Sequence, residues 1–196
     1  MEQMIITIGR QFGSAGHEIA QKLADHYELP LYDKNLLKEI AQEKNLNSSV
    51  LEEYDEVKRN KFLYRSVRGM NSSPEDNVAN LQFEYLRKKA QEGKSFVVVG
   101  RCAETILRDY EGVISIFVTG NREIEKARIM ELYNLNEKKA EDLIDVNNCR
   151  RRQYHDSHCT TKWGEAEVYD LTINSSRLGL DASLEVLTHY IDVRRK

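Results

Sequence analysis

The chain has 196 residues, of which 31% are charged, and this length suits one globular domain with a sizeable core. Its formal net charge of -3 gives no overall attraction to nucleic acid, so a basic ligand site must be local. Three cysteines are too few for a disulfide framework, and no apolar run or leader precedes the first strand, so we expect a cytoplasmic protein with no membrane partner.

The first half of the chain predicts a strand, a glycine loop and a helix, followed by a helical segment. Residues 4–8 are a short β-branched run, which indicates a buried strand, and the helix after the loop ends near Glu28. A brief strand covers residues 29–32, and Asp33 follows it. Further helices are expected over residues 34–44, about 48–63 and about 74–91, with a flexible joint at residues 64–73.

The second half alternates strands with helices. Apolar runs predict strands over residues 95–100, 113–118 and 171–173. Helical patterns cover residues 101–107, 121–133 after a capping Asn121, 136 to Arg152 or Tyr154 after Asn136, and the end of the chain after Asp181.

Alternating strands and helices predict an α/β fold, in which a five-stranded parallel sheet has helices on both faces. Such sheets bind ligands at the carboxyl ends of their strands. The predicted strands are followed there by the glycine loop, Asp33, Gly100-Arg101, residues 120–122 and residues 174–176. Polar and glycine residues therefore collect at one edge of the sheet, where we expect the ligand site.

The glycine loop is a candidate phosphate site. Gly13, Ser14, Ala15 and Gly16 can turn the chain so that backbone N–H groups point inward, and the helix that follows adds its positive N-terminal end. This cradle needs no lysine. The alternative is a tight strand-to-helix turn with no ligand.

The two residues after Gly16 differ from the Lys-Ser or Lys-Thr pair of a standard phosphate-binding loop. His17 stands where a lysine would reach the β- and γ-phosphates, and an imidazole can donate a hydrogen bond there, although it is shorter. Alternatively, His17 faces solvent. Glu18 would repel a triphosphate unless Mg²⁺ lay between them, so we interpret it as a partner of the helix dipole.

Arginines supply the remaining candidates for catalysis. Arg101 directly follows the clearest strand and can grip a phosphate with two parallel hydrogen bonds, or it can form a structural salt bridge. Arg150, Arg151 and Arg152 begin a basic stretch, which suits a mobile lid over phosphates or the solvated end of a long helix.

A third interpretation of the same stretch is a metal site made by His155, His158 and Cys159. Their spacing fits no common zinc pattern, so no metal site is predicted. Trp163 can pack against the lid or anchor a partner.

Four segments, in this order, resemble the cytidylate kinase-like proteins of bacteria: ITIGRQFGSAGHEIA, LPLYDKNLL, FVVVGRCAETIL and YDLTINSSRLGLDASLEVL. The resemblance implies a three-layer fold of the P-loop NTPase type in a single domain. Its core would comprise residues 1–33, 93–149 and 164–196, with a monophosphate-binding helical insertion at 34–92 and a lid at 150–163. ATP and Mg²⁺ are the implied cofactors.

Some residues of the family pattern are retained and others are replaced. The phosphate loop Gly-Lys-Gly-Thr falls on residues 16–19, which keep Gly16 and replace the lysine by His17. The aspartate after the second strand is kept as Asp33, whereas the pyrimidine contacts that should follow fall on Lys34-Asn35 and Lys38-Glu39. Arg101 is kept. In the lid pattern, Arg152, Asp156 and Ser157 match, while His155 and Cys159 replace arginines.

These observations predict a kinase that binds ATP at residues 13–18 and a nucleoside monophosphate or other small acceptor near Asp33 and Arg101. Arg101, Arg152 and His17 would be catalytic, with Arg152 bridging donor and acceptor when the lid closes. Two alternatives stay open, which are a sensor that binds nucleotide without catalysis and a partner-binding module on the same scaffold. Either a monomer or a homodimer is compatible with the sequence.

Overall fold

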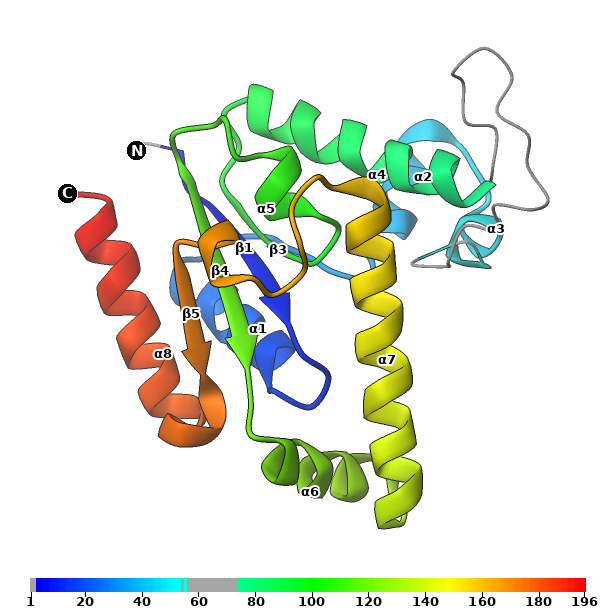
Figure 1. Cartoon of the computed structure of the whole chain (residues 1–196). Helices are drawn as coiled ribbons and strands as arrows, with labels where there is room; N and C mark the ends of the chain where they lie inside the picture. Colours follow the sequence, from blue (N-terminus) through cyan, green and yellow to red (C-terminus); the bar gives the residue numbers. More distant parts are fainter. Residues whose placement is uncertain (1–2, 54, 56–73) are drawn as a thin grey trace.

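Five strands form a single parallel sheet with β1 at its centre (Figure 1). The computed structural model describes residues 3–53, 55 and 74–196. The strand order is β2-β3-β1-β4-β5, which confirms the predicted sheet. The strands are β1 (Ile5–Arg10), β2 (Leu31–Tyr32), β3 (Phe96–Val99), β4 (Val113–Thr119) and β5 (Leu171–Asn174).

The position of β1 determines where the glycine loop lies. In the parallel ladders, Ile5 is the partner of Phe96 on β3 and of Val113 on β4. The carboxyl end of β1 therefore lies between the carboxyl ends of β3 and β4. In parallel α/β sheets, ligands bind in the crevice where the connections lead to opposite sides of the sheet, and the loop after β1 occupies that place.

Helices cover both faces of the sheet (Figure 1). Those described are α1 (Gly16–His26), α2 (Leu36–Lys44), α3 (Ser48–Glu53), α4 (Pro74–Gln91), α5 (Ala103–Ile106), α6 (Arg122–Tyr133), α7 (Glu137–His158) and α8 (Ser175–Arg194), with a 3-10 turn at Ala166–Val168. None of these helices combines the length and the apolar composition that are needed to cross a membrane.

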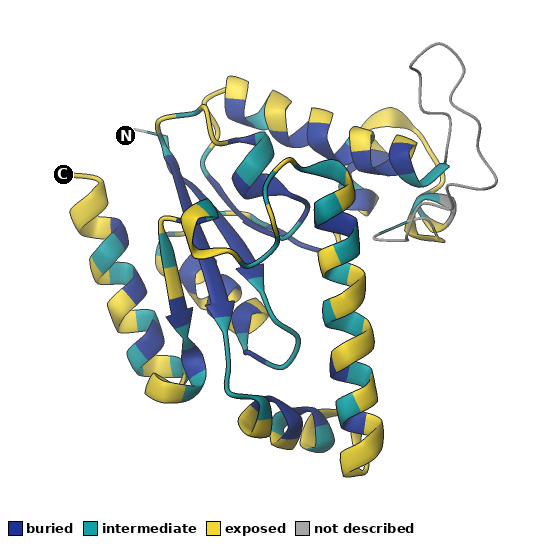
Figure 2. Cartoon of the chain, in the orientation of Figure 1, coloured by how far each residue is buried: buried dark blue, intermediate teal, exposed yellow. Residues whose placement is uncertain are grey.

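Two apolar cores fill the space between the sheet and its helices, because successive side chains of each strand point to opposite faces. On one face, Ile6 and Ile8 of β1 pack with Leu23 of α1 and Leu187 of α8. On the other face, Phe96 lies in a cluster formed with α2, α4 and α5. Figure 2 shows the central strands β1, β3 and β4 mostly buried and the edge strand β5 partly exposed, whereas α7 is mostly exposed or half-buried along its length.

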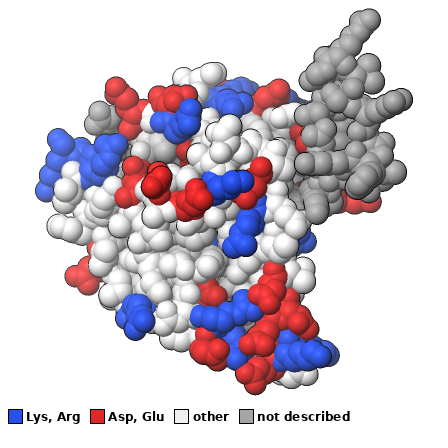
Figure 3. All heavy atoms as spheres, viewed as in Figure 1, with Lys and Arg blue, Asp and Glu red and all other residues white. Residues whose placement is uncertain are grey.

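Helices α6 and α7 stand beside the sheet and are held together by charge. The buried Lys126 ammonium lies 2.8 Å from Glu123, 2.6 Å from Glu137 and 3.4 Å from Glu141. Acidic and basic side chains are intermixed over this part of the surface (Figure 3). The pair therefore forms one packed unit next to the loop after β1.

Helix boundaries differ from the sequence prediction at three places. Helix α7 continues to His158 instead of ending at Arg152 or Tyr154, so the basic run belongs to a regular helix. Helix α8 begins at Ser175, before the expected start at Asp181, and a kink at Gly179, with a φ of 76°, separates its two parts. Only α3 represents the predicted helix at 48–63; of its remainder only Asp55 is among the described residues, and the joint at 64–73 lies outside them.

Replacing Phe96 by alanine should lower the free energy of unfolding by about 3–5 kcal/mol, because the ring is fully buried and leaves a cavity. Val193→Ala is the control, since this side chain is 52% exposed and should change stability by about 0.5 kcal/mol or less. Urea unfolding measures both variants. Equal losses would contradict the placement of Phe96 in the core.

Candidate functional site

The loop between β1 and α1 has the backbone geometry of an anion cradle. Gly13 has a φ of 92°, and Ala15, which precedes the first turn of α1, has a φ of 59°. No side chain among the described residues caps that turn, so its N–H groups remain available to a ligand. A Cβ on Gly16 would lie 2.5 Å from the Cβ of Arg10, so glycine is required for the close packing of the loop.

A cavity of about 560 Å³ lies against this loop. The cavity gathers most of the site residues predicted from the sequence, namely Gly13, Ala15, Gly16, His17, Glu18, Asp33, Arg101, Arg150 and Arg151. Ser14 is buried instead, and its hydroxyl donates to the carbonyl of Gln11 at 2.9 Å. Arg152 and Asp156 are not among the lining residues.

His17 and Asp33 face each other across the cavity. The distance from His17 Nε2 to Asp33 Oδ2 is 3.6 Å, and the imidazole is 54% exposed. The other oxygen of Asp33 accepts a 2.8 Å hydrogen bond from the backbone N–H of Asn35, which fixes the carboxylate at the start of α2. Asp33 is thus oriented by the chain, and His17 reaches it from α1.

Glu18 lines the cavity and forms an ion pair with Arg128 of α6, which lines it too. Its carboxylate is also in the first turn of α1, where negative charge is favourable. This arrangement agrees with the structural interpretation of Glu18 and not with a direct phosphate contact.

Arg101 forms the salt bridge that the sequence left open, and it also lines the cavity. Its guanidinium is buried and binds Asp55 through two hydrogen bonds, from Nη1 to Oδ1 at 2.5 Å and from Nη2 to Oδ2 at 2.9 Å. Gly100, Arg101 and Cys102 have φ values of 73°, 61° and 55°. Each non-glycine residue in this left-handed region stores about 1–3 kcal/mol of strain. Arg101 is thus a salt-bridged residue that also lines the cavity.

The three arginines at the end of α7 point in different directions. Arg151 donates to the carbonyl of Arg10 at 3.2 Å, and its guanidinium lies 5.4 Å from the ring centre of Phe12. Arg150 also lines the cavity. Arg152 is exposed and lies over the ring of Trp163, 5.6 Å from its centre. Of these three arginines, Arg150 and Arg151 line the cavity and Arg152 does not, so a bridging role of Arg152 on closure of the lid stays a prediction.

The cavity is basic at one end and apolar at the other. Its lining includes six Lys and Arg residues against four Asp and Glu residues, although the whole chain is negatively charged. At the apolar end, the rings of Phe12 and Tyr133 stack with centres 6.1 Å apart, next to Ile129 and Leu132. This arrangement suits a ligand that has a phosphate group and a flat or apolar part.

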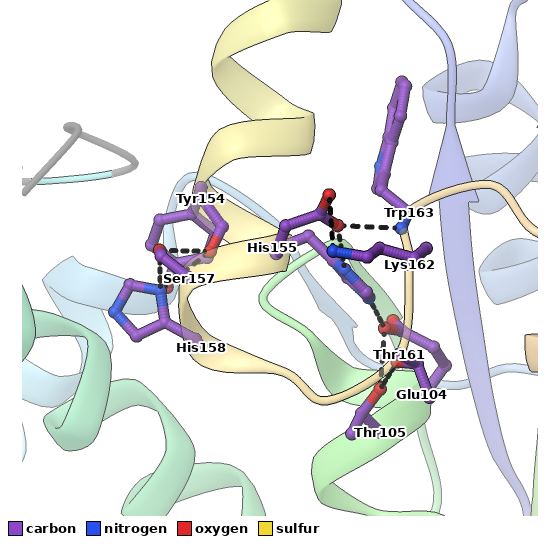
Figure 4. A network of polar contacts seen from close by, with 10 residues as sticks. Glu104, Thr105, Tyr154, His155, Ser157, His158, Thr161, Lys162 and Trp163 are labelled. Atoms are coloured by element: carbon purple, nitrogen blue, oxygen red, sulfur yellow. Dashed lines mark hydrogen bonds and ion pairs between the residues drawn. The ribbon is translucent and has the colours of Figure 1, made fainter.

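A second polar cluster lies at the far end of α7, between that helix and α5 (Figure 4). His155 Nε2 is 2.8 Å from Glu104 Oε1, and His155 Nδ1 is 3.2 Å from Asp156 Oδ1. His158 points elsewhere, since its Nδ1 lies 2.8 Å from the carbonyl oxygen of Tyr154. His158 therefore does not join His155 in this cluster, and Glu104 is the residue that faces His155 instead.

The protonation of this cluster is shifted by its surroundings. Burial acts to lower the pKa of His155, but hydrogen bonds to Cys159 and Glu104 outweigh it and raise the pKa to about 10. A hydrogen bond from Cys102, together with His155, lowers the pKa of the Cys159 thiol to about 5 against the opposing effect of burial.

Three functional neighbours escaped the sequence analysis, namely Asp55, Glu104 and Arg128. Each is the ionic partner of a predicted site residue and lies far from it in sequence. The sequence offered one indication for Glu104, which is its position three residues after Arg101 and beyond β3. That position placed it near the edge of the sheet but did not identify His155 as its partner.

Comparison with known proteins gives a consistent assignment. Residues 5–177 match the family described as "Cytidylate kinase-like family". A crystal structure of an uncharacterized protein from Eubacterium ventriosum ATCC 27560 is 36% identical, covers 97% of this chain and 99% of that chain, and superposes with a TM-score of 0.78. A search of curated proteins gave no match.

Two further solved structures are similar in fold. Shikimate kinase from Bacteroides thetaiotaomicron is 12% identical, covers 96% of this chain and 98% of that chain, and has a TM-score of 0.56. A sugar kinase from Janibacter sp. HTCC2649 is 14% identical, covers 97% of this chain and 95% of that chain, and has a TM-score of 0.52. At these identities the likeness concerns the P-loop kinase fold alone.

The buried carboxyl group of Glu125 packs against the loop between β1 and α1, and it makes the stability of the protein depend on pH. Glu125 of α6 is 3% exposed, and a Cβ on Gly13 would lie 2.9 Å from its Cβ. Burial raises the pKa of Glu125 to about 7, despite the opposing charge of Arg122. The folded state therefore favours the protonated form of Glu125. The stability that this preference contributes is fully present below pH 4.5 and is lost as pH rises through 7.

Glu125→Gln should consequently be more stable than the wild type at pH 8, by about 1–3 kcal/mol, and similar to it at pH 4.5. Urea unfolding at both pH values measures the difference. The exposed Glu185→Gln is the control and should show no such dependence. A Glu125→Gln variant without a gain at pH 8 would show that the carboxyl group is not held protonated.

Proposed function

Because the chain belongs to the cytidylate kinase-like family, we propose that it is a phosphotransferase that moves the γ-phosphoryl group of ATP to a small acceptor. The observation that carries the proposal is the cavity at the carboxyl edge of the sheet. There an uncapped helix N-terminus and an excess of basic side chains meet a buried carboxylate, Asp33. Phosphoryl transfer depends mainly on positioning and on charge of this kind.

The phosphates of ATP would bind to the backbone N–H groups between Gly13 and Glu18. Their fit is supported by the left-handed Ala15 and by the uncapped first turn of α1. Arg150 and Arg151 would add positive charge from α7. The apolar end around Phe12 and Tyr133 can pack against a ring of one of the substrates.

The oxygen donors of the cavity also fit Mg²⁺. This ion prefers one or two carboxylates together with substrate phosphates. Glu52 is the lining carboxylate that would hold it, since Asp33 faces His17 and both Glu18 and Asp55 are paired with arginines. The P-loop threonine of the family falls on Ile19, which is fully buried and offers no ligand. When bound, Mg²⁺ neutralises phosphate charge.

The acceptor would lie between Asp33 and Arg101. Its oxygen attacks the γ-phosphorus while the bond from that phosphorus to the bridging oxygen breaks, and ADP leaves. If the acceptor is a hydroxyl, Asp33 takes its proton; a phosphate acceptor gives up none. His17 would donate a hydrogen bond to a γ-phosphate oxygen, and Arg101 would bind an anionic group of the acceptor in competition with Asp55.

A second candidate function is binding of nucleotide without transfer. The observation that favours it is His17 at the lysine position, half-exposed and paired with a carboxylate. A lysine would place a permanent charge on the β- and γ-phosphates, and an imidazole places one only when it is protonated.

We expect the protein to form ADP and a phosphorylated product with at least one member of a panel of nucleoside monophosphates and small alcohols, in the presence of Mg²⁺. Mass spectrometry of the acceptor and coupled detection of ADP measure the two products. Binding of ATP in calorimetry, with no product from any acceptor, would instead support the second candidate. Absence of ATP binding by the folded protein would contradict both.

His17→Ala should reduce kcat by about 10²-fold, because it removes one donor to the transferred phosphate. Lysine restores a fixed charge, so His17→Lys should be at least as active as the wild type. His26→Ala, at the other end of the same helix and exposed, is the matched control and should leave kcat unchanged. Equal activity of the alanine variant and the wild type would remove His17 from the catalytic group.

A further inference from the structure

We propose that Glu104, His155 and Cys159 form a binding site for a divalent transition metal of the zinc class, separate from the ATP cavity. One ligand atom from each residue lies within 4.8 Å of the other two. Small movements of the three side chains would bring these atoms around one ion. Glu104 belongs to α5, and His155 and Cys159 belong to the end of α7.

The donor set selects the class of metal. A thiolate, an imidazole nitrogen and a carboxylate oxygen are the ligands that Zn²⁺ takes, whereas Mg²⁺ and Ca²⁺ prefer oxygen alone. A thiolate and a carboxylate together carry two negative charges, which a divalent cation balances. Glu104 and His155 are 5% and 3% exposed, and a bound cation would take the place of the imidazolium proton in balancing this buried charge.

The orientation of His155 matches that of a metal ligand. Its Nε2 faces Glu104 (Figure 4). Its Nδ1 lies 3.2 Å from the carboxylate of Asp156. Histidines that bind metals with one nitrogen usually donate the other N–H to such a carboxylate. Asp156 is itself held by a 3.0 Å hydrogen bond from the backbone N–H of Trp163.

The local structure explains why this site is absent from the sequence analysis. His155 and Cys159 are four residues apart and therefore lie on one face of α7, where the N–H of Cys159 donates to the carbonyl of His155 at 2.9 Å. The third ligand comes from a distant helix, not from His158. The spacing along the chain alone therefore matches no zinc motif.

There is also room for a water ligand. Beside Glu104 and His155 lies a second cavity of about 20 Å³, which is enough for one water molecule. Three protein ligands and one water make a four-coordinate zinc site with an open position. A bound ion would tie α7, which carries His155, to α5, which carries Glu104.

The full-length protein, treated with a chelator and kept reduced, should bind one Zn²⁺ per chain in equilibrium dialysis. Its Co²⁺ complex should show thiolate-to-cobalt absorption in the near ultraviolet. Cys159→Ser should abolish that absorption and weaken Zn²⁺ binding by more than about 100-fold, and Asp156→Asn should weaken it by about 10–100-fold. Cys149→Ser, which changes an exposed cysteine of the same helix, and His158→Gln should retain both properties.

A measurement on the wild type alone covers the case in which a variant fails to fold. Zn²⁺ should protect Cys159 from alkylation by iodoacetamide, read by mass spectrometry, while Cys149 reacts at an unchanged rate. Lack of stoichiometric binding, an unprotected Cys159, or a thiolate-to-cobalt band that persists in Cys159→Ser would overturn the proposal. These readouts need no nucleotide, so they are independent of the kinase activity.

Discussion

The guanidinium of Arg101 is a permanent charge in a position with little access to water, and the carboxylate of Asp55 balances it there. Removing one partner of such a buried pair costs about 3–5 kcal/mol, because the other charge is left uncompensated. Asp55 follows α3, whereas Arg101 follows β3. The pair thus fastens the helical segment between β2 and β3 to the edge of the sheet where the cavity lies.

The turn that carries Arg101 also organises the cluster at the end of α7. Three successive residues with positive φ, beginning at Gly100, reverse the chain directly after β3. The reversal places Arg101 at the cavity and starts α5, from which Glu104 reaches His155. One strained turn therefore connects the two polar centres of the molecule, and α7 passes both of them.

The sequence was sufficient to predict the parts of the structure that rest on local patterns. Strands that are buried on both faces appear in the sequence as continuous β-branched runs. The loop from Gly13 to Gly16 could be recognised because its glycines stand between such a run and a helix. The ion pairs of Arg101, Glu18 and His155 could not be predicted, because their partners are distant in the chain. The direction of each arginine from Arg150 to Arg152 could not be predicted either, because successive residues of a helix point about 100° apart and only the packing of α7 decides which of them line the cavity.

The uneven charge of the cavity has a kinetic consequence. A chain with a net charge of -3 repels polyanions at long range, yet the cavity lining is basic. The screening length at physiological ionic strength is about 8 Å, so the distant acidic surface is largely masked there, and the local field of the cavity attracts anions. Added salt then relieves the long-range repulsion first and weakens the capture of the anion afterwards, so diffusional encounter is fastest at an intermediate ionic strength.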